Sequence, residues 1–277
     1  MEFCKILLLI TLILPGNSIF SVAQPRRTAL PVLKHRFVVI AHRGEHLDAP
    51  ENTMASTKGA IAAGADFVEV DLRTTKDSAL VILHDATVDR TTNGHGLIST
   101  LTLAEIQPLC TRNARNGSFT HEGIPSFEAI LAACRNKINI YLDFKDADAA
   151  KAYALIRKYK MERHTIVYIN TPAQFTEWRG VAPAMPLMVS LPDSVRTPES
   201  LHQYLHRTPC SILDGNWNAY TPELIKAALQ NKVAVWPDIQ SHDELANWPA
   251  ALRLGFGGLQ TDHPSHLIKW LHRKGIR

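Results

Sequence analysis

Short apolar segments alternate with longer amphipathic segments along most of this 277-residue chain. The apolar segments are rich in Val, Ile, Leu and aromatic residues and mostly lack polar alternation, which is typical of parallel strands buried on both faces. The strands predicted on this basis are Phe37–His42, Phe67–Arg73, Ile138–Phe144, Thr165–Asn170, Pro186–Ser190, Ser211–Gly215, Val233–Asp238 and Gly257–Thr261. The alternation therefore predicts an α/β fold built on a parallel sheet.

Helix signals lie between these strands. The segment Asn52–Ala63 follows Pro50 and precedes Gly64, residues that favour the start and the end of a helix. The other predicted helices are Ser126–Cys134, Ala147–Lys160, Pro172–Val181, Pro198–Arg207, Thr221–Gln230 and Asp243–Leu252. Eight strands with helices between them fit a closed TIM (β/α)8 barrel, and an open, doubly wound sheet is the structural alternative.

One stretch interrupts the alternation after the second predicted strand. Leu80–His84 predicts a further short strand, and Asp85–Gly123 is then rich in Thr, Asn, Gly, Arg and His, with a weak helix signal at Leu103–Leu109. A connection of roughly 40 residues is long for a compact domain and usually marks a functional loop or a small insertion. We therefore expect an insertion at about residues 85–123, over one end of the barrel.

The first 23 residues have the pattern of a secretory signal peptide. Lys5 precedes the apolar run Ile6–Leu14, and the small residues Ser21 and Ala23 suit a cleavage site. The run is shorter than the ~20 residues of a membrane span, and an uncleaved anchor and a buried N-terminal helix are the alternatives. We expect a secreted or periplasmic protein without a stable membrane span, in which residues 24–277 form a single barrel domain close to the ~250 residues typical of this fold.

The net charge of the chain bears on which molecules it can bind. The formal net charge is +4 and no block of Lys and Arg is present, so we expect no nucleic-acid partner, while an anionic small-molecule substrate is compatible with this charge.

Cys110, Cys134 and Cys210 are not in a CxxC arrangement, which leaves open one disulfide with a free thiol or three thiols. The oligomeric state is also left open. No GxxxxGK[ST], GxGxxG, GxSxG or HExxH pattern occurs.

Acidic side chains occupy strand positions where apolar residues would be expected. Glu69 and Asp71 are two positions apart on a predicted strand and therefore point to the same face. Burying two carboxylates together is unfavourable without a counter-charge. A divalent cation would resolve the conflict, and oxygen ligands favour Mg²⁺ or Ca²⁺ over zinc. Asp143, on the following strand, is a candidate third ligand, and ordinary ion pairs with Arg or Lys are the alternative interpretation.

Basic and aromatic residues stand at other strand ends. His42 and His84 could divide acid and base roles near neutral pH, and hydrogen-bonded core histidines are the alternative. Arg43 and Lys145 would place positive charge beside the carboxylates, where they could bind phosphate oxygens or simply neutralise the acids. Trp236 could line a substrate pocket or pack inside the barrel.

The segment from Ala41 to Gly96 closely resembles the N-terminal signature of the glycerophosphodiester phosphodiesterase family, within the superfamily of phospholipase C-like phosphodiesterases. The shared pieces are His-Arg-Gly, Pro-Glu-Asn-Thr, Gly-Ala-Asp with Val-Glu-Val-Asp, His-Asp, and Arg-Thr-Thr followed by Gly-x-Gly, in that order. Near the end of the chain, residues 257–264 are similar to the family's closing Gly-x-x-x-Thr-Asp-x-Pro. The resemblance thus brackets most of the chain after the signal peptide.

The resemblance implies a TIM barrel with a small insertion after the second strand and one bound divalent cation, Ca²⁺ or Mg²⁺. It implies that His42 and His84 are the general acid–base pair. It also implies that Arg43 and Lys145 bind the substrate phosphate. The implied metal ligands are Glu69, Asp71 and Asp143, with Glu51 as a further candidate close to the metal or the substrate.

Two positions depart from the family's pattern. The third acidic ligand is normally Glu in a Glu-x-Lys arrangement, and here it is Asp143, which is shorter by one methylene. The family's Trp-Thr-x-Asn on the seventh barrel strand reads Trp-Pro-Asp-Ile over residues 236–239. Trp236 therefore remains a candidate pocket residue, while the rest of the pocket for the alcohol differs.

The expected activity is metal-dependent hydrolysis of glycerophosphodiesters to glycerol 3-phosphate and an alcohol. One alternative is a phospholipase D- or C-like action on lipid or lysolipid phosphodiesters. The alternative from another class is a non-catalytic exported barrel that binds anions. Such a barrel would be expected to have lost members of the residue set, yet both histidines, the Glu69/Asp71 pair, Arg43 and Lys145 are all present.

Overall fold

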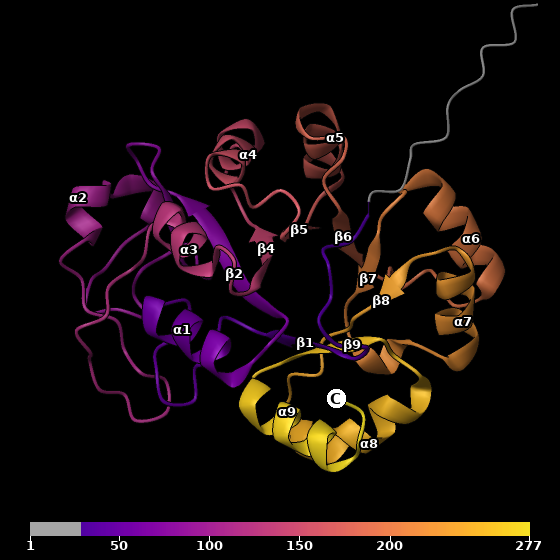
Figure 1. Cartoon of the computed structure of the whole chain (residues 1–277). Helices are drawn as coiled ribbons and strands as arrows, with labels where there is room; N and C mark the ends of the chain where they lie inside the picture. The colour runs from indigo at the N-terminus through magenta and orange to yellow at the C-terminus, as the bar shows by residue number, and fades with distance from the viewer. Residues whose placement is uncertain (1–28) are drawn as a thin grey trace, which may run out of the picture.

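The computed structural model describes residues 29–277, and the predicted signal peptide lies outside this range. Within it, eight parallel strands form a nearly closed barrel in the order β8-β7-β6-β5-β4-β2-β1-β9, surrounded by helices (Figure 1). This confirms the TIM barrel and excludes the doubly wound alternative. The strands of the barrel are β1 (Val38–Ala41), β2 (Phe67–Thr74), β4 (Asn139–Phe144), β5 (Thr165–Ile169), β6 (Leu187–Ser190), β7 (Ile212–Asp214), β8 (Ala234–Val235) and β9 (Gly258–Thr261).

The helices that cover the barrel are α1 (Met54–Ala63), α3 (Phe127–Cys134), α4 (Ala149–Lys158), α5 (Pro172–Val181), α6 (Pro198–Arg207), α7 (Pro222–Gln230), α8 (Glu244–Leu254) and α9 (Pro264–Arg273). Helix α9, which closes the final β/α unit, was not predicted from the sequence. A short 3₁₀ helix, η2 (Trp217–Ala219), precedes α7. The predicted helix Ala147–Lys160 was too long, because the Asp148 side chain caps the first turn of α4 by accepting from the Lys151 N–H.

Three consecutive barrel helices begin with the same dipeptide. Thr171, Thr197 and Thr221 are the N-caps of α5, α6 and α7, and each is followed by proline. Each threonine hydroxyl accepts a hydrogen bond from a backbone N–H of the first turn, and proline at the first helical position lacks only an N–H that would have no partner there. The repeated Thr-Pro sequence therefore fixes where each helix starts after its strand.

The last strand pairing is the weakest in the barrel. The predicted strand Val233–Asp238 was too long, since β8 contains only Ala234 and Val235. Pro237 has no N–H for the ladder, which interrupts regular pairing. An isolated parallel bridge between Asp238 and Gln260 nevertheless links this segment to β9. Beyond the proline, the Ile239 N–H donates to the Gln260 carbonyl at 3.1 Å. The segment after β8 is thus joined to β9 by isolated backbone bridges rather than by a regular ladder.

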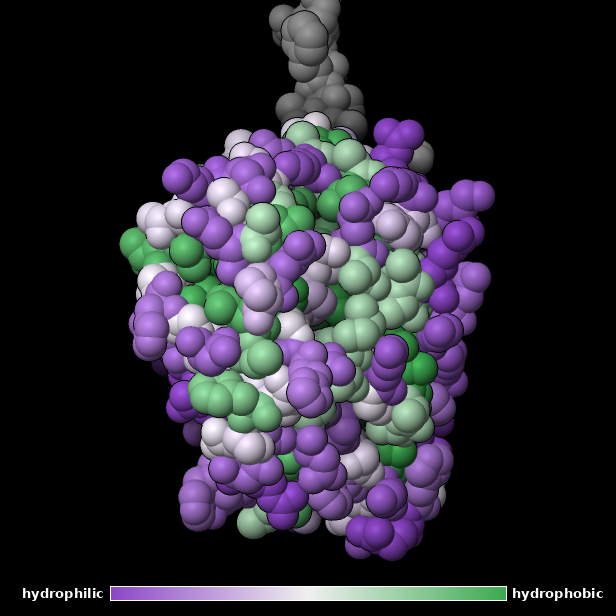
Figure 2. Space-filling model, turned by 90° about the vertical axis from the view of Figure 1, so that its left-hand side faces the viewer, coloured by the Kyte–Doolittle hydropathy of each residue, from purple (hydrophilic) through white to green (hydrophobic). Residues whose placement is uncertain are grey.

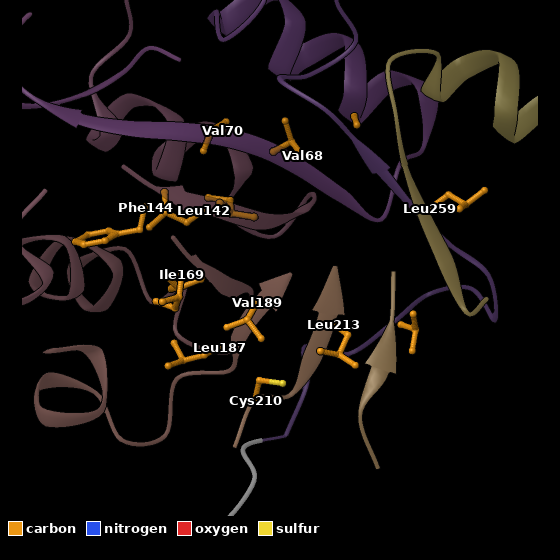
Figure 3. Packing of buried hydrophobic residues seen from close by; sticks show 14 of the residues in the cluster. Val68, Val70, Leu142, Phe144, Ile169, Leu187, Val189, Cys210, Leu213 and Leu259 are labelled. Atoms are coloured by element: carbon orange, nitrogen blue, oxygen red, sulfur yellow. The ribbon is translucent and has the colours of Figure 1, made fainter. Parts of the chain in front are cut away.

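Outward-facing strand side chains pack between the barrel and the helices. Figure 3 shows Val68 and Val70 of β2 near Leu142 and Phe144 of β4, within one continuous buried cluster. Phe144 also meets Trp178 of α5 edge-to-face, with ring centroids 5.3 Å apart. Burying a side chain of this size stabilises the fold by about 1.5–3 kcal/mol. This layer fixes the strands in place and leaves their inward side chains available for the barrel interior.

The barrel interior is apolar at the N-terminal ends of the strands. A second buried cluster, here called the inner cluster, contains Val38, Ile40, Phe67, Tyr141, Ile166, Met188, Ile212 and Trp236. The partly buried side chains of Leu30 and Leu33 pack against it. Because side chains alternate along a strand, the inward positions above this cluster belong to the C-terminal end of the barrel.

The segment between β2 and α3 lies beside the barrel. Its first part, β3 (Leu80–Ile82), pairs antiparallel with β2, and the segment then contains η1 (Ile98–Thr100) and α2 (Leu103–Ile106). Its buried residues form a small cluster of their own: Val81, Leu83, Val88, Ile98, Ile106 and Ile124. Figure 2 shows the side of the molecule that carries α1 to α4, where hydrophilic residues cover most of the surface around smaller hydrophobic areas. Among residues 29–277, no helix is both long enough and apolar enough to cross a membrane.

Candidate active site

The inward positions of neighbouring strands carry the acidic residues. Phe67 of β2 belongs to the inner cluster, so Glu69 and Asp71 share its inward face. In the parallel ladder between β2 and β4, Asp71 lies opposite Asp143, and Glu69 lies opposite Tyr141. The three carboxylates therefore converge just above the apolar floor of the barrel.

Glu69, Asp71 and Asp143, here called the acidic cluster, offer carboxylate oxygens that all lie within 4.8 Å of one another. Asp143 reaches the cluster in spite of its shorter side chain. Burial and the charges of the other two carboxylates raise the pKa of Glu69 well above its usual value. An all-oxygen donor set of three carboxylates this close together fits a hard divalent cation.

Lys145 already neutralises part of the acidic cluster. Its Nζ lies 3.0 Å from an Asp71 oxygen and 2.5 Å from an Asp143 oxygen. Burial opposes ionisation of Asp71, but Lys145, His84 and Arg43 outweigh it and hold the pKa of Asp71 below its usual value. Asn52 also donates to Asp71, at 2.7 Å. Lys145 thus pairs with two carboxylates of the acidic cluster, as one of the sequence interpretations expected.

Both predicted histidines are held by a carboxylate through the same ring atom. His42 Nδ1 lies 2.6 Å from Asp262 Oδ1, and His84 Nδ1 lies 2.7 Å from Asp85 Oδ1. This arrangement fixes the orientation of each ring and leaves Nε2 for another partner. Arg90, from the segment after β3, donates to Asp85 at 2.6 Å and thereby fixes the carboxylate that orients His84.

The two histidines meet Glu69 and Asp143 of the acidic cluster in one pocket. This pocket, here called the mouth pocket, has a volume of about 240 Å³. The residues that line it are His42, Glu69, His84, Tyr141, Asp143, Lys145, Tyr168, Asn170, Asp214, Asp238, Gln240 and Gln260. The structure thus brings together residues from widely separated parts of the chain, at the strand ends where barrel enzymes carry their active sites.

Arg43 lies next to the acidic cluster in an unusual backbone conformation. Its φ of 52° is left-handed, and its N–H donates to Glu69 at 2.7 Å. The following Gly44 has a φ of 88°, and a Cβ there would lie 2.7 Å from the Ser56 carbonyl carbon, so this turn requires glycine. The Nε of Arg43 is buried and has no hydrogen-bond partner. This Nε lies 3.7 Å from Asp71 Oδ2, so the guanidinium keeps a donor without a hydrogen bond, which suits a phosphate oxygen.

Two predicted residues are placed differently from the interpretation of the sequence. Glu51, a candidate metal ligand, lies outside the acidic cluster and accepts hydrogen bonds from Arg43 and Arg90, each at 2.8 Å. Trp236 does not line the mouth pocket, because it is buried in the inner cluster with its ring 5.4 Å from that of Phe67. Glu51 therefore positions two arginines, and Trp236 packs the barrel floor.

Sequence reasoning also missed several residues of the site. Asp262 and Asp85 were not predicted as partners of the histidines. Tyr141, Asp214 and Gln260 were not assigned to the pocket. The alternation of inward and outward positions could have placed Tyr141, two residues before Asp143, and Asp214, two residues after Ile212 of the inner cluster. Gln260 lies two residues after Gly258, where a Cβ would meet Trp236 of the same cluster.

Comparisons with known proteins agree with this geometry. The model of the glycerophosphoryl diester phosphodiesterase family matches residues 42–266. A glycerophosphodiester phosphodiesterase from Caldanaerobacter subterraneus subsp. tengcongensis is 32% identical over 245 residues, covering 86% of this chain and 98% of the relative. A solved glycerophosphodiester phosphodiesterase from Agrobacterium tumefaciens has a TM-score of 0.75 at 27% identity, covering 84% of this chain and 99% of that one.

A more distant structure shares the fold. It is an Oleispira antarctica phosphodiesterase in complex with its product sn-glycerol-3-phosphate, with a TM-score of 0.73 at 21% identity. The match covers 85% of this chain and 96% of that one.

Proposed function

The chain belongs to the glycerophosphoryl diester phosphodiesterase family, and from this premise we propose that it hydrolyses glycerophosphodiesters to glycerol 3-phosphate and an alcohol. It is a phosphoric diester hydrolase. The observation that carries the specific proposal is that two carboxylate-held histidines, His42 and His84, meet members of the acidic cluster in one pocket.

The basic side chains of the site would bind and orient the phosphate. Arg43 offers its Nε, which makes no hydrogen bond and lies 3.7 Å from Asp71, while its Nη1 is held by Glu51. Burial acts against the charge of Lys145, but Asp71 and Asp143 outweigh it and raise the pKa of its ammonium group, which therefore stays charged. When Ca²⁺ or Mg²⁺ is bound by Glu69, Asp71 and Asp143, it supplies positive charge that offsets the charge growing on the phosphate oxygens.

The histidines would move the protons. The Nε2 of one histidine takes a proton from the nucleophile, which is either water or the neighbouring glycerol hydroxyl, as a new P–O bond forms. The other histidine gives a proton to the leaving alcohol oxygen as its P–O bond breaks. Attack by the glycerol hydroxyl gives a cyclic phosphate, which then adds water. Since Asp262 and Asp85 hold the two rings in the same way, either histidine is equipped for either role.

The test is release of glycerol 3-phosphate from a panel of headgroup diesters, with Mg²⁺ and Ca²⁺ supplied in turn and with EDTA as a third condition. We expect turnover with at least one ion and its loss in EDTA. Inactivity of the wild type on every glycerophosphodiester would contradict the proposed substrate class. Full activity in EDTA would contradict the metal dependence alone.

A second candidate substrate follows from a cavity next to the mouth pocket. This cavity of about 490 Å³ shares Tyr168 and Asn170 with the mouth pocket, and Phe175, Val189 and Tyr204 are among its other lining residues. Such a wall could hold part of an acyl chain of a lysolipid phosphodiester. The test compares the turnover of a lysolipid in vesicles with that of the corresponding deacylated headgroup diester. The lysolipid function predicts that the lysolipid is turned over faster.

A further inference from the structure

The end of the barrel opposite the mouth pocket is strongly basic. At this end the helices lead into the following strands, and the residues before β1 and after α9 lie there as well. The Lys34 ammonium group donates to the Lys137 carbonyl at 3.1 Å, which places the segment before β1 beside the connection into β4. The exposed cationic side chains of these segments, here called the basic face, are Lys34, Arg36, Arg135, Lys137, Lys160, Arg163, Lys232 and Lys274.

Few carboxylates offset the charge of the basic face. The connections that lead into the barrel strands, together with the residues just before β1 and after α9, contain only two acidic residues, Asp66 and Glu162. Asp66 is buried, and it accepts from Arg277 at 2.6 Å and lies 2.7 Å from His35 Nδ1. The fold thus concentrates positive charge at one end of a chain whose formal net charge is only +4, although the sequence contains no block of Lys and Arg.

Local structure does not account for all of these cations. The negative end of a helix dipole favours a nearby cation, but Lys34, Arg36 and Arg163 stand just before strands rather than at helix ends. Lys160 and Lys232 lie two residues beyond the last residue of α4 and of α7, with left-handed φ values of 58° and 57°. Glycine or asparagine is favoured at such a position. A lysine there has a conformational cost, which indicates that its charge has a use beyond the fold.

Exposed aliphatic side chains accompany the cations. Leu30 and Leu33 pack against the inner cluster, whereas Val32 between them is 81% exposed. Ile276 is 37% exposed, and its neighbour Arg277 donates to the Phe37 carbonyl just before β1. Cations interspersed with exposed aliphatic groups suit the headgroup region of an anionic bilayer, where both kinds of side chain gain. Nucleic acid would attract the cations alone, because its phosphate backbone has no use for aliphatic groups.

We propose that the basic face docks on the surface of an anionic phospholipid bilayer. Lys and Arg side chains near such a surface are attracted to its negative potential, and Val32 and Ile276 enter the headgroup region. The mouth pocket lies at the other end of the barrel, so the docked protein keeps this pocket open to the surrounding solution. In a consequence that rests on the proposed function, the docked enzyme acts on soluble diesters beside the membrane rather than on lipids of the bilayer beneath it.

A fourfold variant tests the proposal by removing half of the basic face. Asparagine replaces the two lysines with a left-handed backbone, since Asn136 already holds the equivalent position after α3 with a φ of 61°. The four changes are Lys137→Gln, Lys160→Asn, Arg163→Gln and Lys232→Asn.

The matched control removes four exposed cations from other parts of the surface, so both variants lower the formal net charge equally. Its changes are Lys58→Gln, Lys76→Gln, Arg196→Gln and Lys226→Gln. None of the eight residues changed lines the mouth pocket. Circular dichroism and thermal melting establish that both variants are folded.

Flotation with vesicles of phosphatidylcholine, with and without phosphatidylglycerol, measures docking of the full chain as the cell exports it. The wild type and the control should bind the phosphatidylglycerol vesicles at least tenfold more tightly than the neutral ones, and this preference should weaken as salt is raised. In the basic-face variant the preference should fall at least tenfold. A wild type without the preference, or an equal loss in the two variants, would overturn the proposal.

Two further measurements separate the remaining outcomes. Wild-type protein that binds a short DNA duplex more tightly than phosphatidylglycerol vesicles at the same salt would overturn the assignment to lipid. Turnover of glycerophosphocholine in solution should be the same in all three proteins. A wild type that docks as expected but turns over no glycerophosphodiester contradicts the proposed function alone and leaves the docking surface standing.

Discussion

His42 Nδ1 lies 2.6 Å from Asp262 Oδ1, although the two residues are 220 positions apart in the chain. β1 and β9 are adjacent parallel strands, so their C-terminal ends bring this histidine and this aspartate together. The pair joins the first strand of the barrel to the last. His84 achieves the same arrangement with its immediate neighbour, Asp85.

Replacing the carboxylate that holds either histidine should slow catalysis. We expect Asp262→Asn and Asp85→Asn each to lower kcat by about 100-fold with a smaller effect on KM, because the ring loses its fixed orientation and tautomer. Asp243→Asn is the control, since Asp243 lies 3.2 Å from the exposed His242 in a comparable surface pair. Steady-state kinetics on glycerophosphocholine checks this, and wild-type kcat in both site variants would contradict it.

Binding of a divalent cation should stabilise the folded protein. A ligand that binds only the folded state adds about 2.7 kcal/mol at 100 times its Kd, which corresponds to about 5–10 °C in Tm for a domain of this size. Glu69→Gln should abolish most of the shift, because it removes a member of the acidic cluster. Thermal melting with Mg²⁺, Ca²⁺ or EDTA measures it. The idea fails if neither ion shifts the Tm, or if Glu69→Gln keeps the full shift.

Glu51 should stabilise the fold in a defined pH range. Burial opposes its ionisation, but Arg90 and Arg43 outweigh this and lower its pKa from 4.5 to about 2. A carboxylate with a lowered folded-state pKa stabilises the protein above pH 4.5, and this contribution disappears as the pH falls toward 2.

At neutral pH, Glu51→Gln should therefore lower the free energy of unfolding by about 3 kcal/mol. The difference from the wild type should shrink between pH 4.5 and 2. Urea unfolding over this range measures it, with the exposed Glu199→Gln as the control. A difference independent of pH would show that the effect has another origin.

Asp214 should have the opposite effect on stability. Burial and Asp238 raise its pKa, and a carboxyl group with a raised folded-state pKa becomes destabilising as the pH rises above its ordinary value of 3.8. Asp214→Asn removes this titration, so its stability relative to the wild type should increase from pH 4 to 7. Urea unfolding at the two pH values checks the sign. A relative loss of stability at pH 7 would contradict the explanation.

Much of the barrel was predictable because its strands are buried on both faces and appear as apolar runs. The end of β8 could not be predicted from the apolar run, because Pro237 stops regular pairing within it. Helix α9 was missed although Pro264 suits a first helical position. The boundaries of these elements depend on backbone partners that the local sequence does not contain.

Within the site, the predictable residues were those whose inward direction follows from the alternation of side chains along a strand. Glu69 and Asp71 follow from a spacing of two on one strand. Glu51 did not follow, because its partner Arg90 lies 39 positions away in the segment after β3. Trp236 was ambiguous, since alternation gives its inward direction but not its depth, and its contact with Phe67 places it at the floor.

The central claim is that His42 and His84 move protons in one pocket during hydrolysis of a glycerophosphodiester. The direct test is single-turnover release of glycerol 3-phosphate from glycerophosphocholine by the wild type, His42→Ala and His84→Ala, with saturating metal. We predict that each variant is folded and reacts at least 100-fold more slowly than the wild type. Wild-type rates in either folded variant would contradict the claim.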